Sequence, residues 1–252
     1  MAEDRLYRKV SRRIIPLMMV LYLFAFLDRV NIGFAALTMN QDLGFTPYIY
    51  GWGAGIFFLG YILFEVPSNV VLAKVGARLW ICRIMVTWGV ISSAMAFGGG
   101  EWSFYVLRFL LGVAEAGFLP GMIFYLTHWF PAARRAKFVA LFMAAVPLAS
   151  ALGAPISGFI LGVDGVLGLK GWQWLFILEG LPSCLLGVLV LVLLPDGPAK
   201  ASWLTDAEKA AIADGLARDR ARNPHRVHES LWPALRDYRV ILLGFVYFGI
   251  VV

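Results

Sequence analysis

The sequence predicts an all-α membrane protein, a six-transmembrane-helix bundle followed by the start of a seventh helix. The chain has 252 residues, of which 60% are hydrophobic and only 15% charged, whereas an ordinary soluble domain is about 45–50% apolar and about 25% charged. Apolar windows of about 20 residues, long enough to cross a hydrocarbon core of about 30 Å, recur along most of the chain. Basic residues are concentrated in alternate gaps between these windows, as in a chain that crosses a bilayer repeatedly.

The six complete spans are expected over 14–38, 50–72, 79–98, 102–126, 137–162 and 173–194. A polar amino-terminal segment, 1–13, precedes them, so the six-helix bundle occupies 14–195. The last apolar segment, 238–252, begins near Tyr238 and covers about 21 Å as a helix, which is too short to cross the membrane. We therefore expect an interrupted seventh helix.

The one long polar region, 196–237, is expected to be a cytoplasmic linker. Thr205 and Glu208 have the spacing of a capping box, in which each side chain bonds a backbone amide of the other residue. A short helix should therefore run from there to about Arg222. Because Trp203 and other apolar residues lie beside many charges, this helix is expected to be amphipathic and to lie along the inner membrane surface.

The positions of the basic residues give the orientation of the chain. Of the 22 Lys and Arg, 19 lie in four blocks, at 1–13, 74–83, 134–137 and 200–239. The positive-inside rule makes these segments cytoplasmic and predicts a multi-pass protein of the cell (inner) membrane with a cytoplasmic amino terminus. The net charge of +6 therefore reflects membrane topology, and nucleic acid is not an expected partner.

The sequence suggests no cofactor or metal site. The two cysteines, Cys82 and Cys184, lie in or beside apolar segments and lack the spacing of a metal site or a disulfide framework. His225 and His228 are three residues apart, but solvated loop histidines are the simpler interpretation.

Six ionisable side chains lie inside the apolar windows: Asp28, Arg29, Glu65, Arg108, Glu115 and Glu179. A charge at membrane depth costs about 2.5–3.5 kcal/mol on insertion scales, so each residue is a candidate for function. Arg108 and Glu115 are seven residues apart and share one stripe of a helix, where Gly112 leaves room for a ligand or a close neighbouring helix. Asp28 and Arg29 are adjacent and diverge by about 100°, so they can serve two neighbours or two sides of one cavity.

The alternative interpretation is that these charges form buried ion pairs that hold helices together. It is the simpler one for Glu65, which lies close to the cytoplasmic edge. It is also simpler for Glu179, which precedes Gly180 and Pro182 and would satisfy amides freed at a kink.

Charge balance favours a functional role for the other four residues. Their two arginines and two carboxylates sum to zero, so an incoming organic anion would leave the site net negative unless a proton came with it. Arginine stays charged and binds a carboxylate through two parallel bonds, so the carboxylates are the groups that must titrate. Binding of the anion and binding of the proton would then favour each other. This is the thermodynamic requirement for proton–anion symport.

Four stretches resemble the anion:cation symporters of the major facilitator superfamily, namely Leu27–Ile32, Glu65–Arg78, Arg108–Gly117 and Trp172–Gly180. That family includes bacterial tartrate, phthalate, hydroxyphenylacetate and sugar-acid permeases. The resemblance implies two six-helix bundles that move by alternating access, with the site between them near the midplane. We expect this chain to be the amino-terminal part, without the carboxy-terminal six-helix half, of a transporter that is monomeric at full length.

The resemblance also implies the roles of individual residues. Arg29 and Arg108 would bind the substrate carboxylate, Tyr61 would face the same cavity, and Asp28 and Glu115 would carry the proton. The expected function is secondary active import of a dicarboxylate, hydroxy acid or sugar acid by proton symport, with H⁺ as the coupling ion. The protein is not expected to be an enzyme.

Other functions are open at this point. An anion channel, or an exchanger without proton coupling, would use the same arginines. An intramembrane serine hydrolase would need Ser157 as nucleophile and His128 as base, but the expected spans separate them by about 30 Å along the membrane normal. A seven-helix receptor would need an outside amino terminus, which the basic residues contradict.

Overall fold

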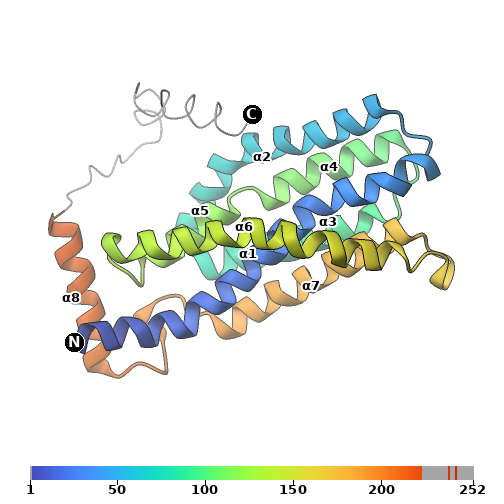
Figure 1. Cartoon of the computed structure of the whole chain (residues 1–252). Helices are drawn as coiled ribbons and strands as arrows, with labels where there is room; N and C mark the ends of the chain where they lie inside the picture. Colours follow the sequence, from blue (N-terminus) through green and yellow to red (C-terminus); the bar gives the residue numbers. More distant parts are fainter. Residues whose placement is uncertain (1, 223–237, 239–241, 243–252) are drawn as a thin grey trace. The chain divides into compact units, whose positions relative to one another are not determined.

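The computed structural model describes residues 2–222, 238 and 242 (Figure 1). The chain divides into two compact units, Met1–Leu216 and Ala217–Val252. The candidate site lies entirely in the first unit. The expected seventh helix and the second part of the linker lie outside the described residues, apart from Tyr238 and Leu242.

The described chain is built from α-helices joined by short connections. In order they are α1 (Ala2–Asp42), α2 (Pro47–Val75), α3 (Ala77–Met95), α4 (Glu101–Glu115), α5 (Phe118–Thr127), α6 (Ala132–Leu161), α7 (Gly171–Leu193) and α8 (Asp206–Arg222), with two short 3-10 helices, η1 (Val166–Gly168) and η2 (Pro198–Lys200). The all-α prediction is thus confirmed for this part of the chain. By length and composition, five stretches of the described chain could cross a membrane: α1, α2, α4 with α5, α6 and α7. The remaining expected span corresponds to α3, which has 19 residues and carries Arg78 and Arg83.

The span expected over 102–126 is found as Glu101–Thr127, but as two helices and not as one continuous helix. α4 ends at Glu115, and Gly117 adopts a left-handed conformation with φ of +85° before α5 begins. The freed carbonyl of Ala116 accepts a hydrogen bond of 2.6 Å from the Ser68 hydroxyl, which itself accepts one of 2.9 Å from the Trp80 indole. Glycine tolerates the left-handed region without the steric cost of a Cβ atom. The break therefore lies directly after a candidate site residue.

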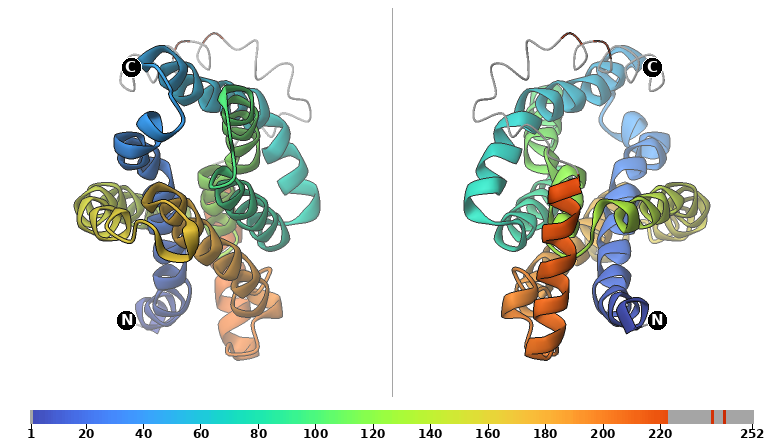
Figure 2. Two further views of the ribbon diagram at one scale, coloured as in Figure 1. Left: turned by 90° about the vertical axis from the view of Figure 1, so that its right-hand side faces the viewer. Right: turned by 90° about the vertical axis from the view of Figure 1, so that its left-hand side faces the viewer.

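Glycines set the close approach of the packed helices, which Figure 2 shows nearly end-on. α2 packs on α4, where a Cβ atom added to Gly112 would collide with the carbonyl oxygen of Phe57. α3 packs on α7, where a Cβ atom at Gly180 would lie 2.7 Å from the carbonyl oxygen of Gly89. Small residues of this kind let helix backbones approach closely in membrane proteins. The contact at Gly112 brings α4, with Arg108 and Glu115, against α2.

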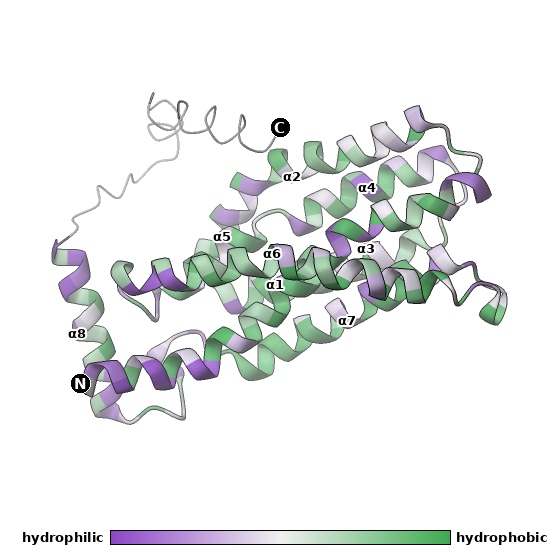
Figure 3. Cartoon of the chain, viewed as in Figure 1, coloured by the Kyte–Doolittle hydropathy of each residue, from purple (hydrophilic) through white to green (hydrophobic). Residues whose placement is uncertain are grey.

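Large apolar side chains cover much of the outside of the helices. Phe159, Leu185 and Val192 are each more than 70% exposed. Hydrophilic residues gather at the starts of α1 and α6 and on α8, whereas hydrophobic residues cover the middle of the long helices (Figure 3). An apolar surface of this extent is suited to lipid rather than to water.

The segment after α7 is held against the start of α1. Trp203 stacks on Trp129 with ring centroids 5.7 Å apart and planes 8° apart. The predicted capping box is confirmed, because Thr205 N–H donates to Glu208 over 2.9 Å and Glu208 N–H donates to the Thr205 hydroxyl over 3.3 Å. Glu208 also forms an ion pair of 2.7 Å with Lys9 of α1.

The first part of α8 has its apolar residues covered by protein. Leu204, just before the helix, is 5% exposed, and Ile212 within it is fully buried. These side chains pack into the core of the first unit, so they are not free to enter a membrane surface in this conformation.

Candidate functional site

The structure brings the predicted site residues of α1 and α4 together beside α2. Asp28, Arg108 and Glu115 are each at most 5% exposed, whereas the side chain of Arg29 is 32% exposed. The aromatic ring of Phe57 lies among the two arginines and Tyr61. The four charges therefore form one buried cluster with a single accessible cation.

Arg29 and Glu115 form a direct ion pair through Nη2 and Oε1. The guanidinium of Arg29 also lies over the ring of Tyr61, at 5.4 Å from its centroid, and over that of Phe57, at 5.9 Å. Its Nε atom has no hydrogen-bond partner among the described residues. Because a guanidinium has five N–H donors in a fixed fork, Arg29 has donors left for a further anion.

Arg108 is a buried cation held by a backbone carbonyl and an aromatic ring. Its Nε donates to the carbonyl oxygen of Gly53 over 3.1 Å, and its guanidinium lies 4.7 Å from the centroid of Phe57. Within the described chain it forms no direct ion pair, although Asp28 and Glu115 are close enough to act on it electrostatically. A buried cation without a direct partner is costly, which suits a site that receives an anion.

Asp28 faces a different helix from Arg29. Its carboxylate accepts hydrogen bonds from the Trp88 indole and the Ser92 hydroxyl, both of α3, and one of 3.2 Å from the Asn31 amide. The two adjacent side chains therefore contact different helices: Asp28 contacts α3, and Arg29 contacts α2 and α4. Asp28 is held by three donors and does not touch Arg29.

The two remaining acids form no ion pair within the described chain, although Glu65 is close enough to Arg29, and Glu179 to Asp28, to act on it electrostatically. Glu179 is 5% exposed, and its Oε1 accepts a long hydrogen bond of 3.5 Å from the Ser157 hydroxyl. The carboxylate thus contacts a side chain of α6, and no described contact joins it to amides freed at a kink, as the sequence had suggested. Glu65 is half-buried on α2, one turn after Tyr61, and its carbonyl oxygen accepts from the Asn69 amide over 2.9 Å.

Sequence reasoning missed the neutral partners of these charges. Phe57 precedes Tyr61 by four residues and so lies on the same face of α2, and Trp88 precedes Ser92 by four residues in the same way. This spacing was visible in the sequence. The charges that these residues contact, however, lie on other helices.

The residues of the hydrolase alternative are not brought together. Nδ1 of His128 lies 3.1 Å from the carbonyl oxygen of Phe124, and its ring packs on that residue. Ser157 donates to Glu179. No described contact joins Ser157 to His128, so the geometry does not support a nucleophile–base pair.

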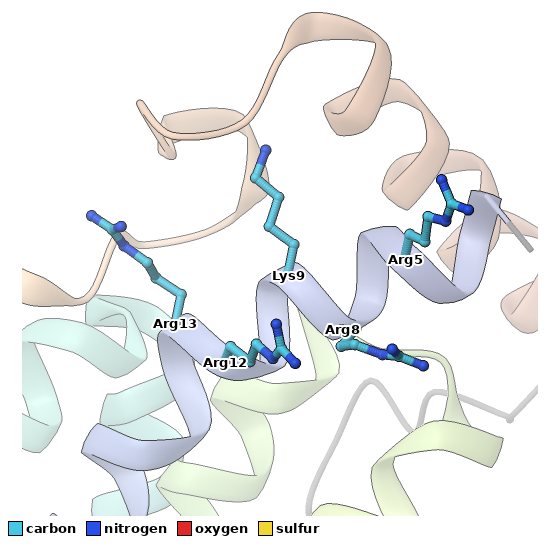
Figure 4. A pocket seen from close by; sticks show the side chains of 5 residues that line it. All are labelled: Arg5, Arg8, Lys9, Arg12 and Arg13. Carbon is cyan, nitrogen blue, oxygen red and sulfur yellow. The ribbon is translucent and has the colours of Figure 1, made fainter.

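A basic cavity of about 520 Å³ lies at the start of α1, away from this cluster (Figure 4). It is lined by Arg5, Arg8, Lys9, Arg12 and Arg13. The 16 residues of helix between Arg13 and Arg29 correspond to about 24 Å. This open cavity therefore belongs to the hydrophilic end of the bundle and not to the candidate site.

Comparisons with known proteins find relatives along nearly the whole chain. The chain is 58% identical over 247 residues to a protein of Agrobacterium vitis named "Putative tartrate transporter", an alignment that covers 98% of this chain and 55% of the relative. It is 51% identical over 246 residues to "Putative metabolite transport protein NicT" of Pseudomonas putida, covering 97% of this chain and 56% of that protein. The chain thus spans about half the length of these relatives.

A solved structure shares the fold. A bacterial homologue of the human lysosomal transporter Spinster, in an inward-facing and occupied conformation, matches with a TM-score of 0.66 at 18% identity, over 80% of this chain and 46% of that one. The family model described as Major Facilitator Superfamily matches residues 18–252. With its apolar helices, the chain is a multi-pass membrane protein, and it belongs to the Major Facilitator Superfamily.

Proposed function

We propose that the full-length protein imports a small organic carboxylate by proton symport through alternating access. The observation that supports this most directly is the ion pair between Arg29 and Glu115. One partly exposed cation is occupied by a buried carboxylate of the protein itself, so a substrate carboxylate must compete with Glu115 for Arg29.

Protonation of Glu115 would resolve this competition. A neutral carboxylic acid no longer forms an ion pair, so the Arg29 guanidinium becomes available to a carboxylate of the substrate, which it binds through two parallel hydrogen bonds. Arg108, which has no direct ion pair among the described residues, would bind another part of the same substrate anion. One carboxylate charge of the substrate then replaces that of Glu115, and this single exchange leaves the net charge of the buried cluster unchanged.

Asp28 would carry a proton in the same cycle. It is buried and lies near Arg108, so occupation of Arg108 by substrate removes part of the attraction that favours the charged carboxylate. Proton uptake and substrate binding therefore favour each other at both acids. Tyr61 would close one side of the site, because its ring already lies against Arg29.

The relatives and the charge pattern support the substrate class and the location. The name of the Agrobacterium vitis relative suggests that the substrate is a hydroxy dicarboxylate such as tartrate. The basic blocks of the chain support a cytoplasmic amino terminus in the cell (inner) membrane.

The test uses the full-length protein in proteoliposomes with radiolabelled tartrate. Glu115→Gln should abolish uptake driven by a pH gradient, because the glutamine cannot release a proton, and should spare counterflow exchange of substrate. Glu101→Gln, at the start of the same helix, is the matched control and should keep both activities. Unchanged pH-driven accumulation by Glu115→Gln would refute the proton role, and tartrate exchange without any proton dependence in the unmodified protein would identify an exchanger instead.

A further inference from the structure

Glu179 is a buried carboxyl group that has no cation as a partner among the described residues. It lies in the middle of α7 and is 5% exposed, its Oε1 contacts the Ser157 hydroxyl at 3.5 Å, and its Oε2 has no hydrogen-bond partner among the described residues. The close contact between Gly180 and Gly89 packs α7 directly on α3 beside it. This part of the bundle therefore buries an acid with little polar compensation.

The charges around Glu179 do not balance it. Of the three acids that are at most 5% exposed in the spans, Glu115 is paired with Arg29, and Asp28 has three hydrogen-bond donors and Arg108 nearby. The charged group that acts on Glu179 is Asp28, a second carboxylate. Burial and a neighbour of the same sign both disfavour an ionised carboxylate, and a lone buried charge is among the most costly groups in a protein.

Asn31 lies between the two carboxyl groups. Its Nδ2 donates to Asp28 over 3.2 Å, and its side chain is close enough to act on Glu179 electrostatically. An amide has one acceptor and one donor group, so its oxygen can accept from a protonated Glu179 while its nitrogen donates to an ionised Asp28. With Glu179 ionised, the single amide would lie between two acceptors of like charge.

We propose that Glu179 holds a proton as a neutral carboxylic acid and that Asn31 links this proton to Asp28. Glu179 then joins Asp28 and Glu115 as a third proton-carrying residue of the bundle. Its part in coupling rests on the proposed symport, whereas its protonation does not. The proposed proton on Glu179 needs only three neighbouring residues around it. These are Asp28 and Asn31 of α1 and Ser157 of α6.

The test is infrared spectroscopy of the purified full-length protein in lipid at neutral pH, in the range of the C=O stretch of protonated carboxyl groups. Glu179→Gln should remove one band from this range. Ser157→Ala should shift that band, because it removes the hydroxyl that bonds Oε1 and leaves the acid in place. Ser150→Ala, on the exposed side of the same helix where the hydroxyl donates to Val146 O, is the matched control and should leave the band unmoved.

The outcomes separate this inference from the proposed function. Spectra of Glu179→Gln and the unmodified protein that coincide in this range would show that Glu179 is ionised and overturn the inference. If Glu179→Gln does not fold, the Ser157→Ala shift decides the question, since an unmoved band overturns the inference as well. A band assigned to Glu179, together with pH-driven uptake unaffected by Glu115→Gln, would uphold the inference and refute the proton role of Glu115.

Discussion

The guanidinium of Arg29 in α1 forms an ion pair with the carboxylate of Glu115, the last residue of α4, and the ring of Tyr61 lies 5.4 Å from that guanidinium. The two charged residues are 86 positions apart in the chain. Their contact joins the first and fourth helices of the bundle beside α2. Since Arg29 is the more exposed partner, it is the group that a ligand can reach.

Replacement of either arginine by lysine should weaken substrate binding severely. Arg29→Lys and Arg108→Lys keep the charge but lose the planar fork, and a hydrogen bond to a charged group contributes about 1.5–3 kcal/mol. We expect the apparent affinity for tartrate to fall by about tenfold or more in full-length protein, measured by equilibrium binding. The control is Arg83→Lys, at a half-buried arginine that lies over Trp80 on α3, and this variant should bind tartrate normally. Normal affinity in both Arg29→Lys and Arg108→Lys would refute the assignment of these arginines to the substrate carboxylate.

Gly112→Ala should destabilise the bundle through the contact between α2 and α4. The added methyl group would collide with the carbonyl oxygen of Phe57, whereas a Cβ atom at Gly55 of α2 meets nothing within 4 Å. Overpacking of this kind costs about 1–3 kcal/mol. Thermal unfolding in detergent should show a lower Tm for Gly112→Ala and an equal or higher Tm for Gly55→Ala, because alanine has the better helix propensity. Equal Tm values for Gly112→Ala and the unmodified protein would contradict the close approach.

Ser68→Ala should loosen the break between α4 and α5. The hydroxyl donates to the Ala116 carbonyl and accepts from the Trp80 indole, so its loss leaves two buried polar groups without partners. The expected cost is about 1–3 kcal/mol for each unsatisfied group. Hydrogen exchange of the amides around Gly117 should be faster than in the unmodified protein, and Ser150→Ala should leave it unchanged. Unaltered exchange in Ser68→Ala would show that glycine alone maintains the break.

The contact of Glu208 with Lys9 should depend on pH. The Lys9 ammonium and the Thr205 amide lower the pKa of Glu208 below its ordinary value of 4.5. A lowered pKa in the folded state means that the contribution to stability is present above pH 4.5 and is lost as the pH falls through the folded-state pKa. Glu208→Gln should therefore speed hydrogen exchange at the start of α8 at pH 7, and the difference from the unmodified protein should disappear in acid.

The control for this pH effect is Glu3→Gln, at an exposed glutamate of α1. It should match the unmodified protein at both pH values. A difference between Glu208→Gln and the unmodified protein that persists unchanged in acid would show that charge is not the source of the effect.

Much of the fold and the site composition could be predicted from local properties of the sequence. Hydropathy windows predict the long helices because burial in lipid depends on about 20 consecutive residues. The rarity of charges in these windows marks Asp28, Arg29, Arg108 and Glu115 before any contact is known. The capping box at Thr205 is equally local, since the two residues are three positions apart.

Partner choice was not predictable in the same way. The spacing of Arg108 and Glu115 indicates a shared stripe, yet Arg108 bonds the backbone of Gly53 and Glu115 pairs with Arg29. The carbonyl freed at the break after Glu115 bonds Ser68, which belongs to another helix. The position of Asp28 in an apolar window also gives no indication that its carboxylate will accept hydrogen bonds from an indole and a hydroxyl of α3.

By itself, then, the sequence determined which segments are apolar enough for lipid and which charges require an explanation. The tertiary structure decided which charges meet, that α4 ends at Glu115, and that Glu179 is buried beside Asn31 without a cation. The physical reason is that hydropathy and charge are properties of short segments. The free energy of an ion pair or a buried acid depends instead on groups brought within a few ångströms by packing of distant helices, and here contacts such as that of Gly112 with Phe57 set those distances.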